Sequence, residues 1–141
     1  MIYLSDLMLT IFYAAFGILL MIVSNAVIDL FIPGDFAEEI RRGNRAVAWL
    51  SAGSFIGIGE ILRAVILSPV YEAADFMQGV LSSAVYAALG IVCFILGFFV
   101  INLWHRKYAL AAEIQKGNTA AGILVFGIFV GLSLVISGAV H

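Results

Sequence analysis

The sequence predicts an all-α membrane protein with four transmembrane helices, arranged as two parallel two-helix repeats in a pseudo-two-fold bundle. Of the 141 residues, 64% are hydrophobic and only 11% are charged, whereas a soluble domain is about half apolar and a quarter charged. The apolar residues fall into four runs, each as long as the roughly 20 residues that a helix needs to cross a membrane. A polar turn between the first two runs recurs between the last two.

These runs fill most of the chain, so we expect a single membrane domain over residues 1–141. The first run is expected to stay as a span and not to be a cleaved signal peptide. Met1–Asp6 has no Lys or Arg, and the apolar stretch is longer than the usual 7–15 residues of a signal sequence. The expected spans are residues 7–31, 46–67, 78–103 and 119–140, with repeat one at 7–67 and repeat two at 78–140.

The placement of basic residues predicts the orientation. Six of the seven Lys and Arg residues lie in the first and third connections: Arg41, Arg42, Arg45, Arg106, Lys107 and Lys116. The middle connection contains Glu72 and Asp75 and no base. Because cytoplasmic loops are enriched in Lys and Arg, we expect loops 32–45 and 104–118 to be cytoplasmic and both termini to lie outside.

Each polar turn opens the second span of its repeat. The turn motif consists of Glu39, Gly43 and Asn44 in the first copy and of Glu113, Gly117 and Asn118 in the second. Before the first copy, Pro33 ends the span, and Asp35 with Glu38 has the form of a capping box for a short interfacial helix. The glycine suits a left-handed helix end, and the asparagine suits an N-cap. Capping is the preferred interpretation; binding of an anion or a headgroup at the helix N-terminus is the alternative.

The repeat extends beyond the turn. A shift of 74 positions gives ten identities over the 21 positions from 37 to 57. Because each repeat contains two spans, both repeats enter the membrane in the same direction and are parallel. Two pairs of glycines match within these segments: Gly53 and Gly57, and Gly127 and Gly131. Small residues four apart allow close helix contacts in membranes, either within the bundle or between subunits.

The candidate polar site within the spans consists of Glu60, Arg63 and Asn25. Glu60 and Arg63 lie three residues apart within the second span, and the second repeat has Leu134 and Ser137 in their place. A charge at mid-membrane costs about 3 kcal/mol on insertion scales, so the pair is either a specific polar site or a tolerated ion pair near the outer interface. A protonated Glu60 is a third alternative. Asn25 in the first span is expected to form an interhelical hydrogen bond.

With two copies of a span, a Glu-Ile-x-x-Gly-Asn-x-Ala turn and a glycine-bearing span, the chain resembles the YjfL-like family of small bacterial inner-membrane proteins. The resemblance covers nearly the whole chain. It implies a multi-pass protein of the bacterial inner (plasma) membrane, without an established activity, cofactor or catalytic residue. It also implies an envelope-stress-type cytoplasmic protein as a partner.

The preferred function is therefore a structural or interaction component that self-associates in the lipid bilayer and recruits a cytoplasmic partner. The alternative is an ion- or proton-conducting subunit that uses Glu60, Arg63 and Asn25. We expect no enzyme activity, cofactor, metal or nucleic acid, because the sequence shows no paired intramembrane acids and no nucleophile set. Cys93 is the only cysteine, and His105 and His141 are expected on opposite sides of the membrane.

Overall fold

The computed structural model describes residues 3–68, 75–104, 107 and 109–140, and helices are the only regular secondary structure among them. Glu72, His105, Arg106 and His141 lie outside the described residues. The long helices are α1 (Leu4–Phe31), α3 (Arg45–Ile66), α5 (Phe76–Trp104) and α7 (Thr119–Ala139), and the short ones are α2 (Phe36–Arg41) and α6 (Leu110–Gln115). The four long helices are long and apolar enough to cross a membrane, which confirms the all-helical class with four candidate spans.

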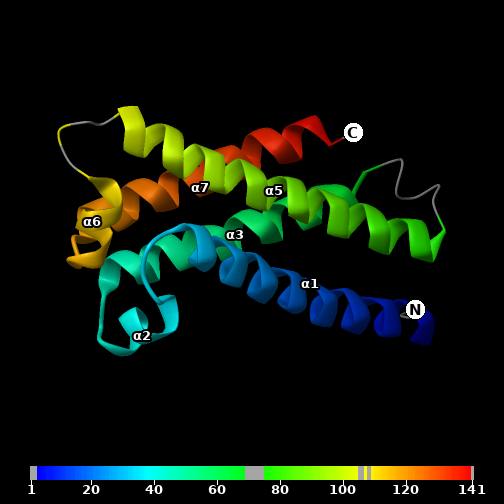
Figure 1. Ribbon diagram of the computed structural model, residues 1–141. Helices are drawn as coiled ribbons and strands as arrows, with labels where there is room; N and C mark the ends of the chain where they lie inside the picture. Colours follow the sequence, from blue (N-terminus) through cyan, green and yellow to red (C-terminus); the bar gives the residue numbers. More distant parts are fainter. Residues whose placement is uncertain (1–2, 69–74, 105–106, 108, 141) are drawn as a thin grey trace.

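The helices form an elongated bundle with two distinct ends (Figure 1). One end, here the turn end, carries α2, α6 and the starts of α3 and α7. The other, the terminus end, carries the N- and C-termini and the start of α5. The helices α1 and α5 run toward the turn end, and α3 and α7 run away from it. The equivalent helices of the two repeats therefore point in the same direction.

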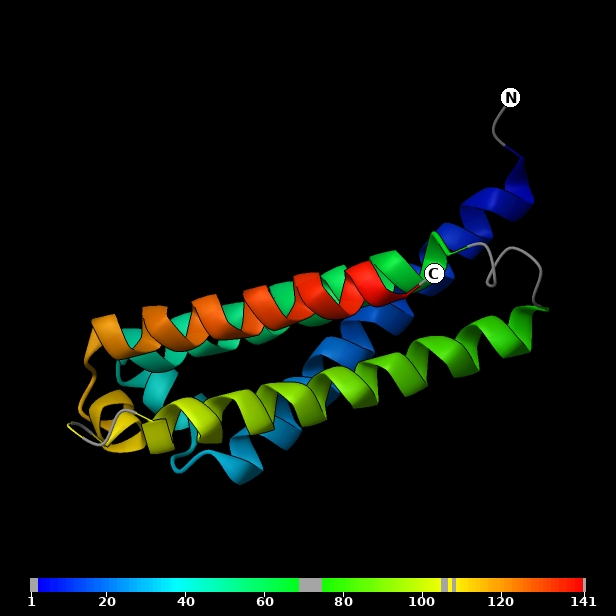
Figure 2. The same ribbon diagram turned by 90° about the horizontal axis from the view of Figure 1, so that it is seen from above.

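The helix α3 is the centre of the packing. Half of the residues in the most apolar stretch of α3 are buried, against 6% in the most apolar stretch of α1. It contacts α7 along most of its length, as Figure 2 shows, and it also packs against α1 and α5. The core between these helices is apolar and includes Leu50, Ile58, Ile61, Phe94 and Phe129. The Phe94 and Phe129 rings stack with centroids 4.7 Å apart.

The same hydrogen bond fixes the short helix of each repeat. Near the end of α1, Asp29 Oδ1 accepts from the Phe36 backbone N–H at 3.0 Å, at the start of α2. Near the end of α5, Asn102 Oδ1 accepts from the Leu110 N–H at 2.9 Å, at the start of α6. Free N–H groups at a helix start need such acceptors. A polar residue near the end of each first span therefore orients the short helix that follows it.

Candidate functional site

The first turn has the capping geometry that the sequence predicts. Asn44 Oδ1 accepts from the backbone N–H groups of Ala46 (3.0 Å) and Val47 (3.2 Å) at the start of α3. Gly43 has φ = 82°, a left-handed conformation that glycine adopts without a steric penalty. The Asn44 amide donates to Glu39 Oε2 at 2.8 Å and, across to the second repeat, to the Ile114 carbonyl at 2.9 Å. Asn44 thus caps α3 and joins the two turns.

The second turn repeats the local geometry but not the connection to the other repeat. Gly117 has φ = 83°, and Asn118 Oδ1 accepts from the Ala120 N–H at 3.1 Å. The Asn118 amide donates to Glu113 Oε2 at 2.9 Å. Asn118 is exposed, whereas Asn44 is buried. The two turns therefore have the same capping residues, and only the first is covered by its counterpart.

The first pair of glycines lies in tight helix contacts. A Cβ atom at Gly53 would lie 2.9 Å from the Phe126 Cα atom of α7. A Cβ atom at Gly57 would lie 2.5 Å from the Phe94 ring of α5 and 3.3 Å from the Phe129 carbonyl oxygen of α7. The distances of 2.9 and 2.5 Å are shorter than real Cβ contacts, so a side chain at either position would force the neighbouring helix to shift. The glycines of α3 are therefore the positions at which α7 and α5 approach its backbone.

The second pair of glycines lies on the surface. Gly127 and Gly131 are exposed, and a Cβ atom at either would meet nothing within 4 Å. The helix α7 contacts α3 with a different stripe, where a Cβ at Gly122 would collide with the Ala46 backbone. A two-fold relation between the repeats would bury Gly127 as it buries Gly53. The expected pseudo-two-fold symmetry is thus not present at this contact.

The surface glycines continue a hollow at the second turn. The hollow has a volume of about 490 Å³ and is lined by Glu113, Asn118, Ala120, Ala121 and Leu124. In repeat one the same shift of 74 positions gives Glu39, Asn44, Ala46, Val47 and Leu50, of which the last four are at most 9% exposed. We call Asn118, Ala120, Leu124, Gly127 and Gly131, all exposed, the open face.

The polar residues within the spans pair with one another. Arg63 Nε donates to Glu60 Oε2 at 2.9 Å, and the Ser137 hydroxyl of α7 lies beside the same carboxylate. Asn25 makes the interhelical contact that the sequence predicts, accepting from the Ser54 hydroxyl of α3 at 3.1 Å. Ser54 and Glu60 are six residues apart, which is about 9 Å along the helix. The structure therefore does not bring Asn25 and the ion pair together.

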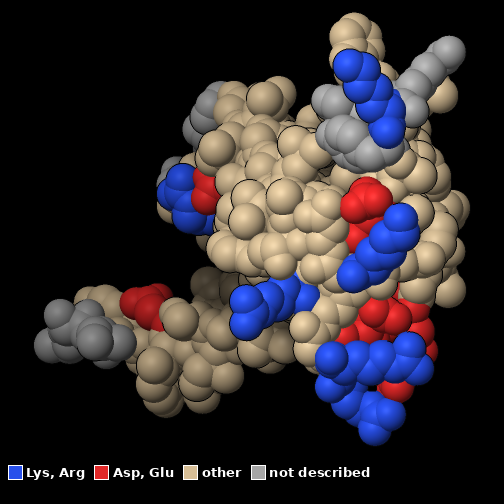
Figure 3. Space-filling view, turned by 90° about the vertical axis from the view of Figure 1, so that its left-hand side faces the viewer, with Lys and Arg blue, Asp and Glu red and all other residues tan. Residues whose placement is uncertain are grey.

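The turn end carries most of the described charges, as Figure 3 shows. Arg41 donates to Glu38 with two nitrogens, each at 2.9 Å, and Arg42 Nε donates to the same carboxylate at 3.2 Å. The hydrogen bond from Arg41 holds the pKa of Glu38 below its usual value. Arg45 is exposed at the first position of α3, and the Lys116 ammonium lies 3.4 Å from Glu113 Oε1. The basic side chains thus border a surface that also contains carboxylates.

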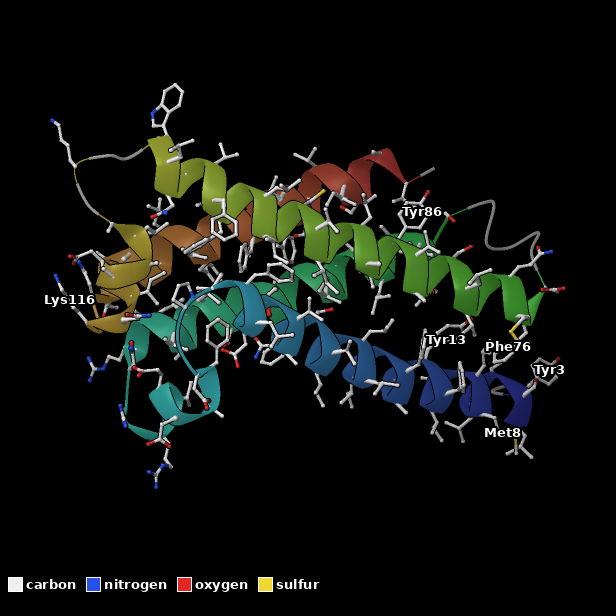
Figure 4. All side chains as sticks on the ribbon, in the orientation of Figure 1. Tyr3, Met8, Tyr13, Phe76, Tyr86 and Lys116 are labelled. Carbon is white, nitrogen blue, oxygen red and sulfur yellow. The ribbon has the colours of Figure 1, made fainter. Side chains whose placement is uncertain are left out.

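A mostly apolar cavity of about 390 Å³ lies toward the terminus end, between α1, α3 and α5. Its lining includes Tyr13, Gly17, Gly59 and Arg63. Tyr13 and Phe76 point toward one another across the gap between α1 and α5 (Figure 4), with ring centroids 6.4 Å apart. Within the part of the chain that the structure describes, no group of three His, Cys, Asp or Glu residues could hold a metal ion.

These features define a multi-pass transmembrane protein with four spans. A family model described as Domain of Unknown Function (DUF350) matches residues 1–140, and the chain belongs to this family. The expected membership of a membrane protein family of unknown function is confirmed at this level, whereas the narrower resemblance to YjfL-like proteins stays a prediction.

Two relatives have names that describe them only as membrane proteins. The chain is 24% identical over 128 residues to the UPF0719 transmembrane protein YshE of Bacillus subtilis (strain 168), covering 91% of this chain and 90% of that protein. It is 26% identical over 106 residues to a UPF0719 transmembrane protein of Aquifex aeolicus (strain VF5), covering 75% of this chain and 38% of that protein. No solved structure matches the chain significantly.

Sequence reasoning missed two features of the site. At a shift of 73 positions Asp29 corresponds to Asn102, but their shared role as acceptors for the N–H groups that open α2 and α6 was not recognised. Sequence reasoning also missed Gly122, which takes the place of Ala48 in the repeat. A glycine at one copy of a repeated position and alanine at the other is a signal of unequal backbone approach, and it was present in the sequence.

Proposed function

We propose that the protein is a structural membrane component that self-associates through the open face and recruits a partner at its turn end. The proposed self-association is supported by one observation. Residues that are buried in repeat one, such as Asn44, Leu50 and Gly53, have identical counterparts in repeat two that are exposed. The chain itself shows that this set of side chains accepts a helix and a turn, because α7 and α6 cover it in repeat one.

Membrane physics favours a protein occupant for such a face. Lipid tails are as apolar as leucine side chains, so helix association in membranes depends on close packing and interhelical hydrogen bonds. Gly127 and Gly131 allow close backbone approach, and the exposed Asn118 amide offers hydrogen-bond donors.

The recruitment part of the proposal rests on the basic residues of the turn end. Arg42, Arg45 and Lys116 line a hollow of about 380 Å³ between the two turns, together with Glu39 and other polar residues. With this end in the cytoplasm, as the positive-inside rule predicts, the surface suits an acidic segment of a cytoplasmic protein. An envelope-stress-type protein is the partner that the family resemblance implies.

The self-association is tested by energy transfer between two differently labelled populations of the full chain in liposomes. We expect transfer for the wild-type protein and an apparent dissociation constant at least about tenfold higher for Gly127→Leu, because the added side chain prevents close approach. Ala88→Leu is the matched control, since Ala88 is exposed on α5 and is not part of the open face. Equal transfer for wild type and Gly127→Leu would contradict the proposal.

A flux measurement separates this function from the conducting alternative. The Glu60 carboxylate and the Arg63 guanidinium already neutralise each other through two hydrogen bonds of 2.9 and 3.2 Å. We therefore expect no pH-dependent ion flux in proteoliposomes and no change for Glu60→Gln. Flux in the wild type that the substitution abolishes would replace the structural function with a conducting one.

A further inference from the structure

Within one chain, α3 and α7 contact each other with unlike faces. The stripe of α3 that contains Gly53 and Gly57 packs against the stripe of α7 that contains Gly122, Phe126 and Phe129. Because the helices are copies of one another, each also possesses the stripe that its partner uses. The open face is the α7 copy of the stripe that α3 uses. The helix α3 in turn has a copy of the stripe that contains Gly122, Phe126 and Phe129 in α7.

That second stripe is also accessible. Shifted by 74 positions, Gly122, Phe126 and Phe129 correspond to Ala48, Ala52 and Phe55. Ala48 and Phe55 are exposed and Ala52 is half-buried. We call these three residues the back face of α3. Farther along α3 the stripe reaches Gly59, where the Met21 side chain of α1 lies against it, so the accessible part is the half nearer the turn end.

We propose that the open face of one copy binds the back face of α3 in a second copy, head to tail, in the register that α3 and α7 use within one chain. This inference rests on the proposed self-association and specifies its geometry. In this register Gly127 lies opposite Ala52, and Gly131 lies opposite Phe55. In this register each glycine of one copy lies opposite a residue that carries a side chain, as Gly53 lies opposite Phe126 within the chain.

The turns extend the same register to a hydrogen bond. Within the chain, the Asn44 amide donates to the Ile114 carbonyl at 2.9 Å. The corresponding contact between copies joins the Asn118 amide to the Ile40 carbonyl of the second copy. Asn118 and Ile40 are both exposed residues. The Ile40 carbonyl already accepts from the Gly43 backbone N–H at 2.9 Å. The Ile114 carbonyl likewise accepts from Gly117 at 3.0 Å and still binds the Asn44 amide. An interhelical hydrogen bond in a membrane adds modest stability and fixes the register.

The contact between copies differs from the contact between α3 and α7 within one chain at the position of Gly122. Gly122 allows the Ala46 backbone to approach closely, whereas its counterpart Ala48 carries a Cβ atom. The contact between copies must therefore be wider at the turn end, with its closest approach shifted toward Ala52. Copies are thus expected to separate more easily than the two repeats of one chain.

A contact between unlike faces also predicts the size of the assembly. A head-to-tail dimer still has one open face and one back face free, so further copies add until the rotation closes a ring. A contact between two open faces would instead use up both surfaces and stop at a dimer. Assemblies larger than a dimer are therefore expected in the membrane.

Disulfide cross-linking between two tagged copies of the full chain tests the geometry. With Cys93 replaced by serine in both, one copy carries Ala120→Cys and the other carries Ala48→Cys, two exposed positions that already have a Cβ atom. A disulfide requires Cα atoms within about 7 Å, which the equivalent contact of Ala46 with Gly122 satisfies. We expect a cross-linked pair only when both variants are present. The control is a copy with Ala15→Cys, on an exposed position of α1.

Each other outcome overturns a defined part of the proposal. Cross-linking of Ala120→Cys with itself would show that two open faces meet, which keeps the self-association and overturns the head-to-tail geometry. Pairing with the Ala15→Cys copy at the same yield would overturn it as well. Absence of every cross-link, with no energy transfer between wild-type copies, would overturn both proposals.

A single substitution gives an independent test. Ala48→Gly restores the glycine that repeat two has at this position, so we expect association about threefold tighter between copies. Glycine at an exposed helix position otherwise only weakens a helix, and a merely structural effect would not tighten association. Unchanged or weaker association of a folded Ala48→Gly variant would count against the proposed register.

Discussion

The two repeats contain the same glycines and the same capping asparagine in different surroundings. In repeat one, Gly53 lies against the α7 backbone and Asn44 is buried between the two turns. In repeat two, Gly127 and Asn118 are exposed. Identical residues thus serve packing inside the chain in one copy and form an accessible surface in the other. The comparison shows that a duplicated sequence does not ensure a symmetric contact.

The cause of the difference lies in a few unequal positions. At the contact between α3 and α7, Gly122 replaces Ala48 and Phe126 replaces Ala52. The missing Cβ atom at Gly122 brings α7 against the Ala46 backbone, and the Phe126 ring packs on Trp49 with centroids 5.2 Å apart. These two changes adapt α7 to present this stripe to α3, and its glycine pair is then directed outward.

The largest expected effect comes from adding the same side chain to both glycine positions. Gly53→Leu would place a side chain where even a Cβ lies 2.9 Å from the Phe126 Cα, so we expect a loss of about 3 kcal/mol or more of unfolding free energy. Gly127→Leu meets no neighbour within the chain and should leave the stability of the monomer unchanged. Unfolding of both variants in detergent, under conditions that keep the protein monomeric, measures the contrast.

A comparable loss of unfolding free energy for the two variants would mean that Gly127 is packed within the monomer. The two repeats would then not differ at this position. The control is Gly138→Leu, at another glycine of α7 whose Cβ position has no neighbour within 4 Å. This variant is expected to match the wild type in stability.

The capping asparagines provide the next contrast. Asn44→Ala removes the cap of α3 and the hydrogen bonds to Glu39 and the Ile114 carbonyl, so we expect a loss of about 2 kcal/mol. Asn118→Ala removes a cap and one bond to Glu113 and should cost about 1 kcal/mol. Chemical denaturation of the two variants measures the difference. A larger loss for Asn118→Ala would show that the second turn is the more tightly held one.

Much of this fold could be predicted from the sequence, because its signals are local. Apolar runs of about 20 residues indicate spanning helices, and Gly-Asn before such a run indicates a left-handed turn and an N-cap, as at Gly43 and Asn44. The interhelical hydrogen bond of Asn25 followed from the cost of an unpaired amide in lipid. These predictions depend on single helices and their ends.

The asymmetric contact could not be predicted in the same way. The pattern of Gly127 and Gly131 is identical to that of Gly53 and Gly57, so both pairs indicated a packed face. Which pair is covered depends on the distance and rotation between α3 and α7, and these follow from all the side chains between them. Small-residue patterns predict where a helix can approach, and only the assembled bundle decides where one does.

The smallest expected effect concerns the second turn and pH. The hydrogen bond from Asn118, followed by the charge of Lys116, holds the pKa of Glu113 below its usual value. A lowered pKa in the folded state means that the ionised carboxylate stabilises the turn above the unfolded-state pKa, and that this contribution is lost as the pH falls through the folded-state pKa. Protection of the Asn118 side-chain amide against hydrogen exchange should therefore decrease in acid, after correction for the intrinsic exchange rate.

The first turn supplies the internal control for this measurement. The Asn44 side-chain amide keeps its bond to the Ile114 carbonyl, an acceptor that does not titrate. This amide should therefore lose less protection over the same pH range. Glu113→Gln should remove the pH dependence at the second turn, because the amide oxygen still accepts from Asn118 at every pH. Equal loss of protection at both turns would indicate that acid loosens the bundle as a whole. Selective loss at Asn118 would show that the exposed turn depends on a single carboxylate, whereas the covered turn is also held by its neighbour.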